Sequence, residues 1–207
     1  MKFIIYNLGC KVNSYESNVM TENLENAGYI LTDKVEDAAI AIVNTCSVTN
    51  TADSKSLKTL RQVKKNNPNI ILIACGCLAQ VNSGVIKEKT NADIIIGNIG
   101  KSKIVDIIKN YLRDKNSIED IKDIMHSSFE TMQLNNFDKT RAFVKIQDGC
   151  NNFCSYCIIP YTRGNVRSKP KDDVIKEVKE LIKSGHQEIV LAGIHTGHYG
   201  SEFKDYD

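Results

Sequence analysis

The sequence has 207 residues, 42% of them hydrophobic, which is ordinary for a protein that buries a core in one large or two small domains. Lys and Arg number 27 against 25 Asp and Glu, and a formal charge of +2 argues neither for nor against a nucleic-acid partner. The first apolar run ends at Asn7, too early for a secretory signal, and no other segment reaches membrane-spanning length. We therefore expect a cytoplasmic protein with no membrane partner, whose thiols stay reduced.

The first half of the chain alternates apolar, β-rich runs with helical patterns. The runs are continuous rather than alternating, as in strands buried on both faces of a parallel sheet. They span residues 3–5, 40–43, 70–73 and 94–96. Repeated strand-helix units predict an open parallel α/β domain, flavodoxin-like or Rossmann-like, over residues 1–115.

Three helices are expected between these strands. Asn13 and Glu16 resemble a capping box, which predicts a helix that Gly28 ends. A second helix begins near Thr51 and stops before Pro68. A third carries its apolar residues on one face between positions 104 and 112.

The second half divides into a linker and a further domain. Residues 116–140 are polar with weak periodicity and predict a linker with one short helix. Residues 141–207 then begin with a strand at 142–146, followed by a cysteine-rich loop, a helix opened by Pro170 and a strand at 188–192. One strand-helix-strand unit cannot bury its own core, so we expect this second domain to be truncated.

The cysteine-rich loop is typical of a metal centre. Cys150, Cys154 and Cys157 are spaced by three and then two residues, so one loop can wrap a metal. A structural zinc site needs four ligands, and no fourth Cys or His lies in this loop. A 4Fe-4S cluster with three thiolates leaves one iron open, so iron-sulfur is favoured and zinc remains the alternative.

Three further thiols each follow a predicted strand. Cys10, Cys46 and Cys77 lie within a few residues of the carboxyl ends of the first three strands. Those ends share one edge of a parallel sheet, so the sequence predicts a second three-cysteine cluster there. Cys75 lies inside or at the end of its strand and is expected to be a packing residue.

The C-x-x-x-C-x-x-C loop after a strand, followed by a helix and a strand ending in Gly193-Ile-His-Thr-Gly197, resembles the radical S-adenosylmethionine superfamily. The resemblance implies that the open iron chelates the amino and carboxylate groups of S-adenosylmethionine, which one electron splits into methionine and a 5′-deoxyadenosyl radical. It also implies that residues 141–207 begin a radical SAM (β/α) partial barrel. Tyr156 would lie beside the adenine, Gly193 would meet the methionine amino group, and His195 would face the cofactor.

Four motifs in order resemble the methylthiotransferases: 7–17 (NLGCKVNSYES), 44–49 (NTCSVT), 76–80 (GCLAQ) and 149–161 (GCNNFCSYCIIPY). Gly-Cys-Lys-Val-Asn at 9–13 and Gly-Ile-His-Thr-Gly at 193–197 resemble the branch that acts on threonylcarbamoyladenosine in tRNA. The implied reaction replaces the inert C-H at carbon 2 of that nucleoside, at position 37, by a methylthio group. A carbon radical can open such a bond, whereas acid-base catalysis alone cannot readily do so.

The resemblance implies two 4Fe-4S clusters, with S-adenosylmethionine, tRNA and an electron donor such as flavodoxin or ferredoxin as partners. The cluster on Cys150, Cys154 and Cys157 would generate the radical, and the cluster on Cys10, Cys46 and Cys77 would carry the sulfur. Relatives continue through further barrel strands into a β-domain that grips tRNA, so we expect this chain by itself to be inactive. Where relatives have an arginine-rich run after Arg163-Gly164, this chain reads Asn165-Val-Arg-Ser-Lys-Pro170, which puts a phosphate or carboxylate contact there in doubt.

Three alternatives remain open. They are a non-catalytic iron-sulfur or zinc module, a methylthiotransferase for isopentenyladenosine, and a flavin binder whose first loop offers Gly9, Asn13 and Ser14 but also places a thiol in the way. Lys55, Lys58 and Arg61, with Lys65, form a basic stripe that fits tRNA phosphates or, more simply, a solvated helix face.

Overall fold

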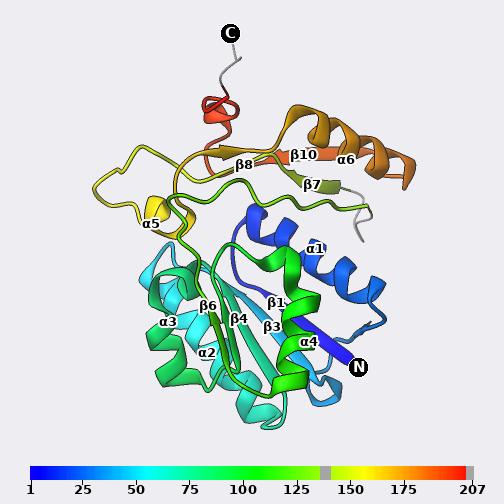
Figure 1. Cartoon of the computed structure of the whole chain (residues 1–207), viewed down its shortest axis with the longest axis vertical. Coiled ribbons are helices and arrows are strands. Elements are labelled where there is room, and N and C mark those ends of the chain that lie inside the picture. Colours follow the sequence, from blue (N-terminus) through cyan, green and yellow to red (C-terminus); the bar gives the residue numbers. More distant parts are fainter. Residues whose placement is uncertain (136–140, 204–207) are drawn as a thin grey trace.

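The computed structural model describes residues 1–135 and 141–203, and the last residues of the expected linker, 136–140, lie outside them together with 204–207. A six-stranded sheet of parallel strands in the order β2-β1-β3-β4-β5-β6 forms the centre of the first half (Figure 1). Its strands are β1 (Lys2–Asn7), β2 (Ile30–Leu31), β3 (Ile40–Thr45), β4 (Ile71–Gly76), β5 (Ile94–Ile96) and β6 (Ile118–Asp120). The α/β class expected from the sequence is confirmed.

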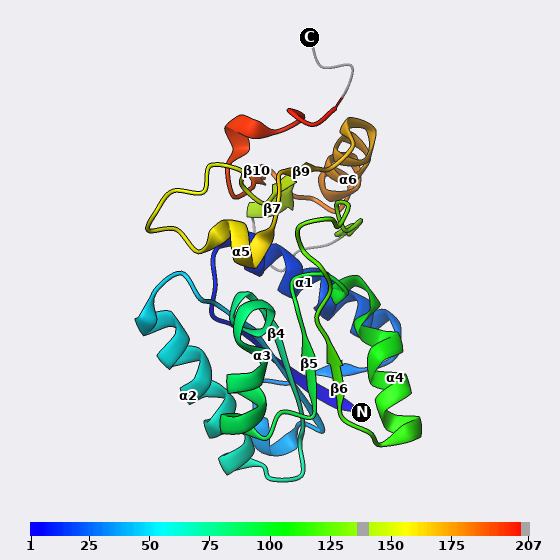
Figure 2. The ribbon, with the colours of Figure 1, turned by 60° about the vertical axis from the view of Figure 1, so that its left-hand side comes forward.

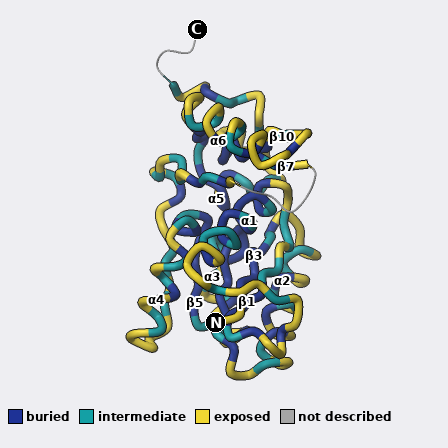
Figure 3. The backbone as a smooth tube through the Cα atoms, turned by 90° about the vertical axis from the view of Figure 1, so that its right-hand side faces the viewer, coloured by how far each residue is buried: buried dark blue, intermediate teal, exposed yellow. Residues whose placement is uncertain are grey.

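Four helices cover this sheet. They are α1 (Lys11–Asn26), α2 (Asn50–Asn66), α3 (Cys77–Thr90) and α4 (Ile104–Asp114), joined by the short turns η1 (Val35–Asp37) and η2 (Lys101–Lys103). Successive strand residues face opposite sides, so Ile40 and Ile42 pack with α1 and α4, whereas Ala41 and Val43 pack with α2 and α3. Both faces are therefore buried, which explains the continuous apolar runs, and the dark interior in Figure 3 shows the result.

The second part lies across the carboxyl end of the sheet (Figure 2). It contains β7 (Arg141–Lys145), β8 (Gln147–Asp148), α5 (Ile159–Arg163), β9 (Arg167–Ser168), α6 (Lys171–Lys183), β10 (Glu188–Ala192) and the turn η3 (Thr196–His198). Strands β7 and β10 pair in parallel, and β8 pairs antiparallel with β9. Tyr15 and Val19 of α1 share a core cluster with Val144 and Leu181, so α1 is packed between the two sheets.

Two local predictions are wrong. Helix α1 begins at Lys11 with Cys10 at its N-cap, so Asn13 and Glu16 lie inside the helix instead of capping it. Both side chains are buried and bind residues far away in sequence, which a local capping pattern cannot reveal. The short helix expected in the linker is absent from residues 116–135, where β6 extends the sheet instead.

Other elements agree with the sequence. Helix α2 has Thr49 at its N-cap, whose hydroxyl accepts a bond from the Ala52 N-H, and ends before Pro68. Helix α6 follows Pro170 as expected. In residues 1–135 and 141–203 no helix combines the length and the apolar character needed to cross a membrane.

Candidate functional site

The three strand-end thiols lie on neighbouring strands at the carboxyl edge of the sheet. Cys10 is the third residue after β1, Cys46 comes directly after β3, and Cys77 comes directly after β4 and begins α3. Cys77 is buried, Cys46 is partly buried and Cys10 is exposed. Burial raises the pKa of Cys46, and negative charge on Cys77 and Cys10 raises it further, so these two thiols lie within electrostatic range of Cys46. The sheet thus brings together the three loops that the sequence predicted.

Buried polar side chains anchor each of these thiols. The Cys10 thiol donates to Asn13 Oδ1 at 3.5 Å, while Asn13 Nδ2 donates to Asn44 Oδ1 at 3.0 Å. Ser56 accepts from the Cys46 N-H at 3.2 Å and donates to the Cys46 carbonyl at 3.1 Å. Asn98 Nδ2 lies 3.6 Å from Cys77 Sγ. The loops are therefore held in place by bonds between distant parts of the chain.

Gly76 shows how tightly the loop before Cys77 is packed. Its φ of 96° lies in the left-handed region, and a Cβ there would stand 2.6 Å from both Asn44 Oδ1 and the Thr45 carbonyl oxygen. Any other residue would strain the backbone and displace β3. The glycine before Cys77 is thus required by the approach of the neighbouring strand.

The second thiol set lies in the loop between β8 and α5. Cys150 is buried, Cys157 is partly buried and Cys154 is exposed, and the Cys157 N-H closes a turn on the Cys154 carbonyl at 2.9 Å. The Cys150 N-H binds the Gly164 carbonyl at 2.9 Å. Gly149 precedes it with a φ of 76°, and a Cβ there would overlap the Asn165 carbonyl at 1.9 Å. The base of the loop is therefore fixed, and its tip faces solvent.

Gln147 joins this loop to the turn after β10, a link that the sequence did not suggest. Its Nε2 donates to the carbonyls of Asp148 and Gly149 at 2.9 and 2.7 Å. Its Oε1 accepts from the backbone N-H groups of Ile194 and His195 at 2.9 and 2.8 Å. The buried Gln147 amide thus fixes the position of the thiol loop relative to the turn at Gly193.

The residues expected to contact S-adenosylmethionine have different surroundings. Gly193 lies at the end of β10, where a Cβ would stand 2.9 Å from Gln147 Oε1. His195 stacks on His198 at 4.0 Å, and its Nδ1 is buried without a partner among the described residues. Tyr156 is 90% exposed. The nearby Phe153 and Tyr161 rings form an edge-to-face pair at 5.9 Å, also on the surface of the loop.

A buried ion network joins the two halves of the molecule at the thiols. Glu16 of α1 receives bonds from Lys101, from Lys145 Nζ at 2.9 Å and from Arg163 Nη1 at 2.6 Å. Asp148 accepts from Lys145 at 2.9 Å and from Arg163 at 3.2 Å. The side chains of these five residues are at most 3% exposed.

The network keeps its carboxylates ionised despite their burial. Burial alone would raise the pKa of Glu16, but Arg163, Lys101 and Lys145 outweigh it and hold that pKa well below its usual range. Burial opposes ionisation of Asp148 in the same way, and its cationic neighbours lower the pKa to about 2. These residues were missed because only the fold brings them together. The position of Glu16 on the same helical face as the apolar Val12 and Val19 is the one signal in the sequence that could have indicated its burial.

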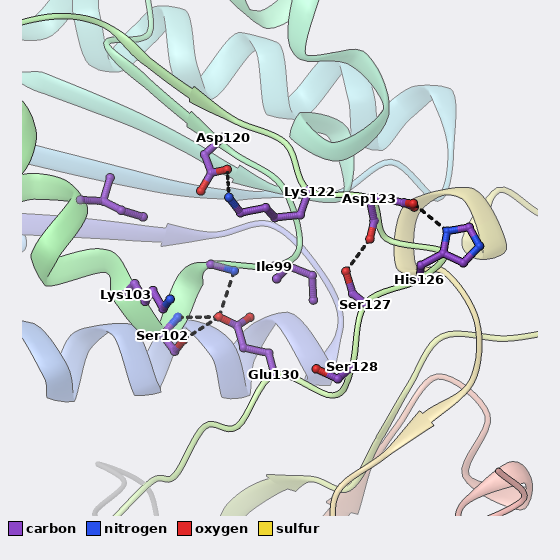
Figure 4. A pocket seen from close by; sticks show the side chains of 12 residues that line it. Ile99, Ser102, Lys103, Asp120, Lys122, Asp123, His126, Ser127, Ser128 and Glu130 are labelled. Carbon is purple, nitrogen blue, oxygen red and sulfur yellow. Dashed lines mark hydrogen bonds and ion pairs between the residues drawn. The ribbon is translucent and has the colours of Figure 1, made fainter.

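A separate cavity of about 680 Å³ lies between the linker and η2 (Figure 4), and no thiol lines it. Its acidic groups already have partners: Asp120 pairs with Lys122 at 2.6 Å, and Asp123 binds His126 at 2.7 Å. Glu130 Oε1 accepts from the N-H groups of Gly100 and Ser102, both at 2.9 Å. The cavity therefore belongs to the packing of the linker rather than to the thiol sites.

Each thiol set offers three free thiols, which is the number that leaves one iron of a 4Fe-4S cluster open. No three His, Cys, Asp or Glu side chains within 1–135 and 141–203 are gathered closely enough to hold a single metal ion. Arg163 Nε and two nitrogens of Arg167 are buried without partners, which suits an anionic group nearby.

Comparison with known proteins supports this assignment. Residues 2–97 match a family described as uncharacterized protein family UPF0004, and residues 144–205 match the radical SAM superfamily. The threonylcarbamoyladenosine tRNA methylthiotransferase MtaB of Bacillus subtilis is 40% identical over 98% of this chain and 45% of its own length. The chain belongs to the radical SAM methylthiotransferase family.

Relatives with two different names occur in this family. A second MtaB, from Aquifex aeolicus, is 34% identical over 97% of this chain and 49% of its own length. A tRNA-2-methylthio-N(6)-dimethylallyladenosine synthase from Clostridium perfringens is 35% identical over 98% of this chain and 47% of its own length. The chain thus spans about half the length of the curated relatives it matches.

Proposed function

We propose that this chain provides the cluster-binding part of a tRNA methylthiotransferase that modifies carbon 2 of N6-threonylcarbamoyladenosine at position 37 of tRNA. The observation that carries the proposal is the presence of two three-thiol sets on two packed units, joined by the buried network around Glu16. A radical reaction that inserts sulfur needs both a source of the radical and a sulfur carrier close to each other. The motifs at residues 9–13 and 193–197 favour this nucleoside, and the 40% identity to the Bacillus subtilis MtaB agrees with them, whereas the Aquifex aeolicus MtaB at 34% and the synthase at 35% do not separate the two branches.

Each thiol set is assigned one role. Cys150, Cys154 and Cys157 would hold a 4Fe-4S cluster, and Cys10, Cys46 and Cys77 a second one. When bound, these groups would supply an electron that cleaves S-adenosylmethionine to a carbon radical and a site that carries the sulfur to be transferred. A flavodoxin or ferredoxin is the proposed electron donor.

The chain's own residues position the molecule that would bind at the cluster on Cys150, Cys154 and Cys157. Gln147 holds the turn at Gly193 against the thiol loop, so the backbone after β10 has a fixed position for binding the methionine part of S-adenosylmethionine. The unpartnered His195 Nδ1 and the exposed Tyr156 ring are the proposed contacts to the rest of that molecule. Neither residue needs to transfer a proton in this assignment.

Iron and sulfide analysis after anaerobic reconstitution tests the two-cluster proposal. Cys46→Ala and Cys154→Ala should each lose about half of the bound iron, because each removes one ligand from one three-thiol set. Cys75→Ala is the matched control, since Cys75 is fully buried in β4 and should not affect iron content. Iron content that does not respond to Cys46→Ala would contradict the proposal.

The nucleoside is tested in cells that lack their own methylthiotransferases. Expression of the gene as it occurs in its genome should yield 2-methylthio-N6-threonylcarbamoyladenosine in digested tRNA, measured by mass spectrometry. Methylthiolated isopentenyladenosine in its place would assign the chain to the other branch. The 207 residues expressed by themselves are expected to give neither product, because the β7–β10 sheet has only two strands in the described residues and Leu191 of β10 is 52% exposed.

The second candidate function is a non-catalytic cluster-binding module, which the exposed Tyr156 and Leu191 side chains favour. Addition of S-adenosylmethionine and dithionite to the reconstituted protein separates the two cases. Formation of 5′-deoxyadenosine supports a working radical site. Full cluster content without this product supports the module.

A further inference from the structure

Arg163 and Arg167 lie where the two thiol sets approach each other. Arg163 ends α5, and Arg167 begins β9, four residues further along. Their side chains are 0% and 7% exposed. Arg167 Nη2 donates to the Arg163 carbonyl, so the two side chains belong to one buried group.

This group carries more positive than negative charge. Four cations, Lys101, Lys145, Arg163 and Arg167, surround two buried carboxylates, Glu16 and Asp148. The nearby carboxylate of Glu130 acts on Arg167 as well, and counting it still leaves one cation in excess. An uncompensated charge is costly to bury, and burial accordingly lowers the pKa of Arg167.

Three N-H donors of these arginines have no acceptor. Arg163 Nε, Arg167 Nε and Arg167 Nη1 are buried and unpartnered among the described residues. Buried donors are ordinarily satisfied, and guanidinium groups are suited to anions. The excess charge and the unfilled donors are independent observations, and both indicate a missing negative group.

Hydrogen bonds through Asn13 and Asn98 connect Arg163 and its neighbour Thr162 to Cys10 and Cys77. Arg163 Nη2 donates to Asn13 Oδ1 at 2.8 Å, the same oxygen that accepts from the Cys10 thiol. Negative charge on Cys77 raises the pKa of Arg163, after the larger effects of its burial and its two carboxylate partners. Asn98 Nδ2, which lies 3.6 Å from Cys77 Sγ, also donates to the Thr162 carbonyl beside Arg163 at 2.7 Å.

We propose that Arg163, with Arg167 behind it, supplies the positive counter-charge for the cluster on Cys10, Cys46 and Cys77 and thereby raises its reduction potential. A cluster held by three thiolates is anionic, and an added electron is stabilised by a cation held in a water-excluded site. Arg163 is a positioning residue in this role because it acts on the cluster through its charge. The proposal rests on the cluster assignment made under the proposed function.

The test measures the reduction potential of the cluster on Cys10, Cys46 and Cys77 in the absence of the other cluster. In a background with Cys150, Cys154 and Cys157 replaced by Ala, the reconstituted protein is titrated anaerobically and followed by electron paramagnetic resonance. Arg163→Gln should make reduction about tenfold less favourable, which is roughly 59 mV for one electron. Arg163→Lys keeps the charge and should therefore retain most of the reduction potential of the unmodified protein. Arg61→Gln, an exposed arginine on α2, is the matched control and should leave the potential unchanged.

A second variant covers the case in which Arg163→Gln does not fold. Arg167→Gln removes a cation from an existing excess, so the protein without clusters should retain its stability. Cluster loading should then raise the melting temperature less in Arg167→Gln than in the unmodified protein, because part of the counter-charge is gone. A purely structural arginine would destabilise both forms equally.

The outcomes separate this proposal from the proposed function. Failure of the unmodified protein to bind a cluster on Cys10, Cys46 and Cys77 contradicts both. Full cluster content with an unchanged potential in Arg163→Gln, or equal thermal shifts in Arg167→Gln where Arg163→Gln does not fold, contradicts the counter-charge role alone.

Discussion

Replacement of Glu16 by Gln should be among the most damaging conservative changes in this chain. Glu16 is fully buried and accepts from Lys101, Lys145 and Arg163. Of these three cations Asp148 pairs with Lys145 and Arg163 only, so Glu16 is the one carboxylate that pairs with Lys101 among the described residues. Gln keeps the shape but leaves an additional buried positive charge without compensation. Removing one partner of a buried ion pair costs about 3–5 kcal/mol. For a protein of this length that corresponds to a fall of roughly 6–20 °C in melting temperature.

The assay is thermal unfolding by circular dichroism at neutral pH, with the protein free of clusters and its thiols reduced. Asp37→Asn is the control, because Asp37 and Lys2 form a 3.5 Å pair in which both side chains are 49% exposed. That change should cost less than about 1 kcal/mol. A Glu16→Gln protein that melts within about 2 °C of the unmodified one would refute the reasoning, since the cations would then have found other compensation.

Three further predictions concern the surroundings of the thiols. Gly76→Ala should lower stability by about 2 kcal/mol or more in chemical denaturation. Gly84→Ala within α3, where a Cβ meets nothing within 4 Å, is the control and should raise stability by about 0.5–1 kcal/mol. A neutral Gly76→Ala would contradict the packing. The buried cations lower the pKa of Asp148 from 3.8 to about 2. Its contribution to stability is therefore present above pH 3.8 and is lost as the pH falls toward 2. Acid unfolding of Asp148→Asn should lack this loss of stability between pH 3.8 and 2. Iodoacetamide and mass spectrometry should find Cys10 and Cys154 modified first, because both are exposed, and Cys75 modified after unfolding, because burial raises its pKa to about 12.

Local apolar patterns were sufficient to predict β1, β3, β4 and β5 and the thiols that follow the first three of them, whereas the short strands β2 and β6 were not predicted. Continuous runs such as residues 40–43 are buried on both faces of the sheet, and the carboxyl ends of β1, β3 and β4 lie side by side as parallel pairing requires. The order of strands and thiols along the chain therefore placed Cys10, Cys46 and Cys77 at one edge. The helix α3 was not predicted, because its apolar residues form only a weak stripe around Gly84.

Interactions between distant residues could not be predicted in the same way. Glu16 binds Arg163 across 147 positions, and Tyr15 donates to Glu177 at 2.7 Å across 162. The capping-box pattern is typical of a solvated Glu16, and the apolar helical face that it shares with Val12 and Val19 was the one local signal of its burial. The sequence assigned no role to Arg163 itself, and the structure directs its side chain inward to Glu16 and Asn13.

The ion network adds something to the junction that its apolar contacts do not. The apolar cluster of α1 with the second unit favours proximity but defines the alignment less strictly, since dispersion forces depend little on direction. Bonds from Arg163 to both Glu16 and Asn13 require one position of α5 relative to α1. Cys10 lies at the N-cap of α1, and the loop with Cys150 is tied to the residue after Arg163, so this alignment also sets the separation of the two thiol sets. In the proposed reaction the radical and the sulfur come from different thiol sets and meet at one substrate, so the network would keep the two sets at the separation that this reaction needs.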